Sequence, residues 1–132
     1  MVTVDIPYAI SLSSYRLDMA GVFYEQDYLA AAWLSEKSDK GDNIFCDTGS
    51  YRSLVLSQAQ NPIYIIWGGQ PFKQGDKILL NEWNTTSGTV TVETGPGQRD
   101  YIDINSINGM SDVLKMGDIV YTNRETRIYV AP

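Results

Sequence analysis

The stretch Asp47-Thr48-Gly49-Ser50 has the residue types best suited to hold a ligand. It follows the apolar run that ends at Cys46 and precedes a segment with a helical pattern. In open α/β sheets, ligands bind beyond the carboxyl ends of strands, and free N–H groups at a helix start can hold an anion. The stretch matches neither the P-loop nor the GxGxxG pattern, and Asp47 would repel phosphate. A plain helix start, with Thr48 or Ser50 as N-cap, is therefore favoured, and residues 47 to 50 are kept as the candidate ligand site.

Carboxylates are the other groups that could do chemistry. Five of the sixteen acidic residues are candidates for pairing or for calcium binding: Asp5, Asp27, Asp47, Asp100 and Asp103. None has the spacing of an EF-hand calcium loop, so no metal site is predicted and solvated surface acids are the favoured interpretation. Glycoside hydrolysis needs two carboxylates at a set separation, which a sequence does not reveal. A hydrolase with paired carboxylates therefore stays open.

The absence of histidine excludes several chemistries at once. The chain has no histidine and one cysteine, Cys46. Nucleophile pairs of serine or cysteine with histidine, imidazole acid–base catalysis and the common zinc sites are therefore ruled out. Cys46 lies in the apolar run Ile44-Phe45-Cys46, which favours a buried thiol over a reactive one. We expect no catalytic residue and no cofactor, and hence a protein that is not an enzyme.

Aromatic side chains offer a possible platform for sugars. The segment Trp67-Gly68-Gly69-Gln70, together with Trp83 and nearby tyrosines, could stack against a sugar ring. Aromatic residues are equally expected in a core or on a sheet surface, and that interpretation is favoured.

Asn84-Thr85-Thr86 is an Asn-x-Thr acceptor pattern for N-glycosylation. It falls in the segment from Asn84 to Gly88, which is expected to be a polar turn. A glycan on Asn84 would fit such a turn in an exported domain. Short patterns of this kind often arise by chance, so the support for an external location is weak.

Charge and hydropathy limit the partners. The net charge is −6 and the sequence pI is about 4.4. Nucleic acids and anionic membrane surfaces attract clustered Lys and Arg, whereas the ten basic residues here are scattered. No apolar run is long enough to span a bilayer. The 132 residues suit a single soluble domain, and we expect no nucleic-acid partner.

The first half of the chain reads as alternating strands and helices. The pattern predicts strands at 2–6, 43–47 and 62–67, helices at 25–37 and 48–58, and a long loop between 8 and 23. Tyr51, Leu54 and Val55 are expected to face inward from the second helix. Such alternation is typical of a parallel βαβαβ sheet.

The second half is richer in turns. Strands are predicted at 77–83 and 89–93, joined by the turn at 84–88, and at 101–104. A weaker helical pattern spans 106–116, and a terminal hairpin is expected from 118–122 and 127–130. The predicted fold is therefore a single α/β domain, in which a mixed sheet has a parallel first half and antiparallel strands in the second half.

Several short motifs resemble a known group of proteins. They are Ile6-Pro7-Tyr8-Ala9-Ile10-Ser11-Leu12-Ser13, Tyr24-Glu25-Gln26-Asp27, Ala30-Ala31-Ala32-Trp33-Leu34-Ser35, Ile44-Phe45-Cys46-Asp47, Lys77 to Asn84, and Asp118 to Asn123 with Ile128-Tyr129. Together they resemble the soluble C-terminal exterior domain of archaeal multi-pass membrane proteins of unknown function. Those proteins are distantly similar to membrane glycosyltransferases that use lipid-linked sugars. Phe45 and Cys46 stand where the pattern has smaller residues.

The resemblance implies a function outside catalysis. Residues 1–132 would be an extracytoplasmic domain, excised from a larger protein and tethered beside its membrane-embedded part. Such a domain would bind or position a glycan, a polymer or a partner protein, and no catalytic residue carries over onto it. The alternative is a free-standing domain that binds a small ligand at the Asp47 to Ser50 turn.

Overall fold

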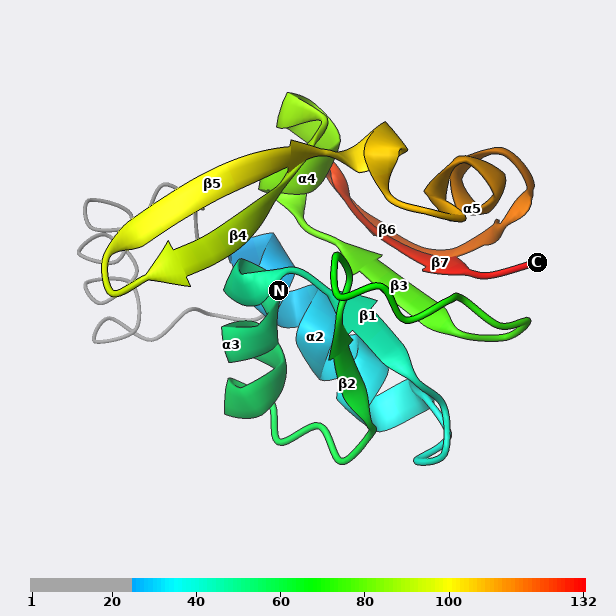
Figure 1. Cartoon of the computed structure of the whole chain (residues 1–132). Coiled ribbons are helices and arrows are strands. Elements are labelled where there is room, and N and C mark those ends of the chain that lie inside the picture. The colour runs from blue at the N-terminus through cyan, green and yellow to red at the C-terminus, as the bar shows by residue number, and fades with distance from the viewer. Residues whose placement is uncertain (1–24) are drawn as a thin grey trace.

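The computed structural model describes residues 25–132, which form a five-stranded mixed sheet with helices on both faces and a separate two-stranded sheet (Figure 1). The chain order of the main elements in its first half is α2 (Glu25–Lys37), β1 (Ile44–Cys46), α3 (Thr48–Leu56), β2 (Ile63–Ile65) and β3 (Lys77–Leu80). The predicted strand at 2–6 and the loop at 8–23 lie outside the described residues.

The main sheet has the strand order β2-β1-β3-β7-β6, in which β6 is Asp118–Asn123 and β7 is Thr126–Val130. Strand β1 is parallel to both β2 and β3. Strand β7 is antiparallel to β3 and to β6, with which it forms the expected terminal hairpin. The prediction of a mixed α/β sheet with a parallel first half is thus confirmed.

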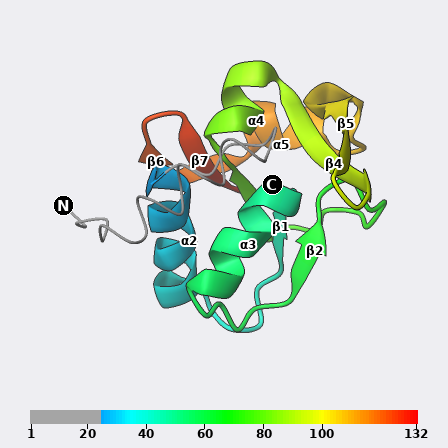
Figure 2. The same cartoon turned by 90° about the vertical axis from the view of Figure 1, so that its left-hand side faces the viewer.

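Alternating side chains give the sheet two buried faces. Ile44 and Cys46 of β1 pack with Ala30, Ala31 and Leu34 of α2, which covers one face together with α3. A strand places successive side chains on opposite faces, so Phe45 points to the other side. Figure 2 shows α2 and α3 side by side on the first face.

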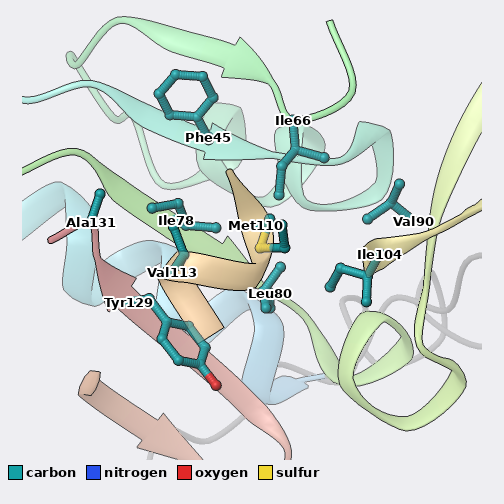
Figure 3. Close-up of a cluster of buried hydrophobic side chains, with 10 residues drawn as sticks. All are labelled: Phe45, Ile66, Ile78, Leu80, Val90, Ile104, Met110, Val113, Tyr129 and Ala131. Carbon is teal, nitrogen blue, oxygen red and sulfur yellow. The ribbon is translucent and has the colours of Figure 1, made fainter. Parts of the chain in front are cut away.

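The second face is covered by α5 (Met110–Met116) and its flanking segments. Met110 and Val113 of this helix lie against Ile78 and Leu80 of β3, and Ile66, just after β2, belongs to the same cluster (Figure 3). Because this cluster joins the residues after β2 to the α5 region, it determines which loops meet at the surface above it.

The segment predicted as the strand 77–83 divides into two elements. Strand β3 ends at Leu80, and the residues after Asn81 form α4 (Glu82–Ser87) in place of the expected turn. Asn81 caps this helix, and Gly88 ends it with a φ of 73°. The capping hydrogen bonds outweigh the strand pattern here because they satisfy the free N–H groups of the first turn.

The following strand, β4 (Thr89–Gly95), does not join the main sheet. It pairs only with β5 (Gln98–Asp103), and the two form a hairpin that projects from the body of the molecule (Figure 1). The predicted helix at 106–116 is shorter: the turn η1 (Ile104–Ser106) comes first, and α5 begins after Gly109, which has a φ of 85°.

Helix α3 turns a different face inward from the one predicted. Leu54 is fully buried as expected, whereas Tyr51 and Val55 are exposed at 44% and 53%. Ser50 and Ser53 take the inward positions in their place. The prediction for Tyr51 and Val55 was wrong because it placed both beside Leu54 on the inward side, and a helix of nine residues has only one narrow buried face.

None of the helices between Glu25 and Pro132 is long and apolar enough to cross a lipid bilayer.

Candidate functional site

Asp47, at the carboxyl end of β1, is a buried carboxylate with a full set of hydrogen bonds. Only 1% of its surface is exposed. Its Oδ1 accepts from the Ser50 N–H at 3.1 Å and from Asn81 Nδ2 at 3.1 Å. Its Oδ2 accepts from Asn84 Nδ2 at 2.8 Å and from the Thr91 N–H at 3.2 Å. The four bonds tie β1, α3, α4 and β4 together at one point.

The two asparagines that contact Asp47 are themselves locked in place. The Asn81 Oδ1 accepts from the Asn84 N–H at 2.9 Å, and the Asn84 Oδ1 accepts from the Asn81 N–H at 2.8 Å. Asn81 Nδ2 also donates to Ser50 Oγ, and Asn84 Nδ2 also donates to the Thr89 carbonyl. We call Asp47, Ser50, Asn81 and Asn84 the Asp47 network.

The position of the Asp47 network follows from the parallel pairing of β1 and β3. The carboxyl ends of parallel strands meet at the same edge of a sheet, so Asp47 and Asn81 lie next to one another. A sequence signal for Asn81 was present in the spacing Asn81-x-x-Asn84, which resembles a capping box. It was missed because residues 77–83 were assigned to a strand.

The predicted ligand site at Asp47 to Ser50 is therefore built into the protein interior. Asp47 is the N-cap of α3, a role that was assigned to Thr48 or Ser50, and Ser50 is 1% exposed. Thr48 and Gly49 are half-buried. Because the carboxylate oxygens already accept four hydrogen bonds, they have little capacity left for a ligand. Binding of a small ligand at this turn stays a prediction.

Asn84 is placed differently from the expectation of an exposed polar turn. It is 1% exposed, and its Nδ2 donates to both Asp47 and Thr89. A glycan is attached at this same nitrogen and would replace one of the two hydrogens. Glycosylation at Asn84 therefore stays a prediction, and it would require at least one of these two hydrogen bonds to be given up.

The other candidate carboxylates among the described residues have separate surroundings. Asp27 is buried, accepts from the Glu82 N–H at 3.0 Å and from Thr126 Oγ1, and so joins the start of α2 to α4 and β7. Asp100 is exposed on β5, and Asp103 caps η1. Asp5 lies outside the described residues. Within residues 25–132, no group of three potential metal ligands is close enough to hold an ion.

Cys46 is fully buried, as expected. Burial raises the pKa of its thiol well above the ordinary value, and the negative charge of Asp47 raises this pKa further. The thiolate is the reactive form of cysteine, so a thiol that stays protonated is chemically inert.

A cleft of about 220 Å³ lies next to the carboxyl end of β2. We call it the Trp67 cleft. Its lining consists of Ile66, Trp67, Gly69, Gln70, Pro71, Ile102, Ser106, Ile107 and Asn108. Three of these residues, Trp67, Gly69 and Gln70, belong to the segment singled out as a possible sugar platform. Ile66 and Pro71 flank this segment, and the other four lining residues come from β5, η1 and the loop before α5, far away in the sequence.

Three polar groups of the Trp67 cleft have no hydrogen-bond partner among residues 25–132, whereas the Ser106 hydroxyl donates to the Asp103 carbonyl at 2.6 Å. The Trp67 Nε1 is buried without a hydrogen bond, a state that is rare for a buried donor. Gln70 and Asn108 are exposed, and in the part of the chain that the structure describes neither side-chain amide is hydrogen-bonded. The lining contains no ionisable side chain. These features suit a neutral ligand with both apolar and hydrogen-bonding faces.

Trp83 does not share the cleft with Trp67. It lies on α4 with its ring centroid 5.7 Å from that of Tyr101, and neither ring lines the cleft. On β5, Ile102 faces the cleft while Tyr101 points to the opposite side, as strand alternation requires. The structure thus brings only the Trp67 part of the expected platform to a cleft. Ser106 and Asn108 were not identified from sequence, because nothing local links them to Trp67.

Comparison of the chain with protein-family models, with curated proteins and with solved structures gives no match.

Proposed function

We propose that this chain is a non-enzymatic binding domain that holds a neutral glycan in the Trp67 cleft. The observation that supports this most directly is the convergence of an aromatic ring with two unpaired amides, Gln70 and Asn108, in one open cleft. Small-molecule sites are concave and mostly apolar, with a few well-placed polar groups that orient the ligand.

The lining favours a sugar over a charged ligand. A sugar ring has an apolar face for Trp67, Pro71 and the isoleucines, and hydroxyl groups that both donate and accept hydrogen bonds. Side-chain amides can do the same, since each carries two donors and an acceptor oxygen. A phosphate or carboxylate would find no cation in this lining, and the chain's net charge of −6 disfavours anions further.

The absence of catalysis is part of the proposal. The sequence contains no histidine, and Asp47, the only buried carboxylate at the carboxyl end of the described parallel strands, is saturated with hydrogen bonds. General acid–base catalysis needs a group that can exchange a proton with the substrate. The lining of the Trp67 cleft offers no such group.

Titration with glycans tests the binding proposal. Maltotriose, cellotriose, mannotriose and chitotriose would be added to the ¹⁵N-labelled protein, and backbone and indole NMR signals recorded. We expect at least one glycan to shift the Trp67 indole signal and to leave that of Trp83 unchanged. Gln70→Ala should weaken this binding about fivefold, the value of one hydrogen bond of about 1 kcal/mol.

Gln60→Ala is the matched control, because Gln60 is also exposed but does not line the cleft. It should leave glycan binding unchanged. Shifts centred on Trp83, or no shift with any of the four glycans, would contradict the proposal.

On the resemblance alone, we propose that the domain lies outside the cytoplasm and is tethered to a membrane-embedded part of the same chain. This proposal predicts several hydrophobic spans encoded upstream of Val2 in the complete gene. A reading frame that begins at Met1 would refute the tethering and leave the binding proposal standing.

A further inference from the structure

A second cavity adjoins the Trp67 cleft. It has a volume of about 160 Å³, and it shares Pro71 and Asn108 with the cleft. Each cavity alone is smaller than the roughly 300–1,000 Å³ typical of small-molecule sites, and only the two together reach that range. The pair therefore offers room for a ligand longer than either cavity.

The two cavities continue one another along both walls. One wall is the loop after β2, where Gln70 and Pro71 border the first cavity and Pro71 and Phe72 border the second. The opposite wall passes from Ile107 and Asn108 to Gly109 in the same direction. Consecutive residues on both sides thus form a single groove.

The floor of the second cavity is held by the core. The Phe72 ring packs edge-on against Phe45, with centroids 4.8 Å apart. On the other wall, a Cβ atom at Gly109 would lie only 3.1 Å from Phe72, so the two walls approach closely at this point. Because both walls are anchored, the groove exists without a ligand and needs little ordering to receive one.

The polar lining changes along the groove. The Trp67 cleft has only neutral groups, whereas the second cavity is bordered by the exposed carboxylate of Asp112 at the start of α5. A carboxylate accepts hydrogen bonds from hydroxyl groups and repels anions. The second cavity therefore suits another neutral, hydroxyl-bearing unit.

We infer that the ligand is a linear neutral oligosaccharide that occupies both cavities, with one unit beside Trp67 and the next beside Asp112. This inference rests on the proposed function, since it assigns a second subsite to the same groove. Affinity should therefore rise with the number of sugar units, because a second unit makes contacts that a single sugar lacks.

A length series tests the two-subsite groove. The monosaccharide, disaccharide and trisaccharide of the glycan that shifts Trp67 would be compared by NMR titration. We expect affinity to rise about tenfold or more between one and three units. Asp112→Ala should reduce this gain severalfold and leave binding of the monosaccharide unchanged, whereas Gln70→Ala should weaken every member of the series.

Ser111→Ala is the control, because Ser111 is an exposed neighbour on α5 that does not line the groove. Equal affinity for one and three units, or a length effect that Asp112→Ala leaves intact, would overturn the second subsite and spare the glycan cleft. Failure of all glycans to bind would overturn both, and so would binding of an extended proline-rich peptide in their place.

Discussion

The carboxyl ends of the three parallel strands carry two contrasting polar regions. Beyond β1 and β3 lies the Asp47 network, in which the carboxylate accepts four hydrogen bonds and is 1% exposed. Beyond β2 lies the Trp67 cleft, in which two amides are exposed and an indole N–H has no partner. The rule that ligands bind at this edge of an α/β sheet does not by itself choose between them.

The difference shows how polar residues divide between stability and binding. A buried polar group contributes to folding only when its hydrogen bonds are satisfied, and leaving it unpaired costs about 1–3 kcal/mol. The Asp47 network satisfies its members within the chain and connects four elements. The Trp67 cleft leaves the exposed amides of Gln70 and Asn108 available to a ligand, and these amides add no intramolecular hydrogen bond to the fold.

The first prediction breaks the Asp47 network at its centre. Asp47→Asn keeps the shape of the side chain but replaces one acceptor oxygen by an NH₂ group that faces other donors. Two hydrogen bonds are lost and donors are left opposed in the interior, so we expect the free energy of unfolding to fall by about 3 kcal/mol, measured by urea denaturation. Asp100→Asn, on the exposed surface of β5, should change it by less than about 0.5 kcal/mol. Similar values for both variants would show that the network does not stabilise the fold.

The second prediction compares one amide from each region. Asn84→Ala removes the two donor bonds to Asp47 and Thr89 together with half of the capping box, so stability should fall by about 2 kcal/mol. Asn108→Ala removes an exposed amide that has no partner within residues 25–132, and it should change stability by less than about 0.5 kcal/mol. Thermal unfolding of both variants is the measurement. An equal loss of stability would contradict the division between the two regions.

The third prediction uses the buried thiol beside the Asp47 network. The pKa of Cys46 is raised in the folded protein, so the folded state keeps its proton when the unfolded state releases it. Stability should therefore fall as the pH rises above about 8.5, the ordinary pKa of cysteine, by at most about 1.4 kcal/mol per pH unit. Cys46→Ala should lack this component. Equal pH dependence of both proteins, measured by urea denaturation between pH 7 and 10, would show that the thiol is not shielded.

Much of the fold could be predicted from local pattern. Helix α2 has the predicted bounds of residues 25–37, and the short apolar runs at β1 and β2 were read as strands at the right places. The hairpin of β6 and β7 was also predicted correctly. These elements follow from side-chain periodicity and turn residues, which are visible within a few positions of the chain.

The errors arose where a local pattern competed with a distant partner. Residues 82–87 have no clear helical pattern, and they become α4 because Asn81 and Asn84 cap each other and both bind Asp47. Tyr51 and Val55 are apolar yet exposed, because the inward face of α3 is used by Ser50 and Leu54. The packing of α4 against β3 and β4, and of α3 against β1 and β4, decides these outcomes.

The features of the candidate sites also separate into those that the sequence determines and those that depend on the tertiary structure. The sequence by itself determined the absence of histidine chemistry, the acidic charge and the residue types at Asp47 to Ser50 and Trp67 to Gln70. Tertiary structure alone decided that the Asp47 carboxylate accepts hydrogen bonds from Asn81 and Asn84, and that Trp67 lies across a cleft from Ser106 and Asn108. Composition and spacing are properties of neighbouring residues, whereas the pairing of a polar group depends on which distant segment the fold places against it.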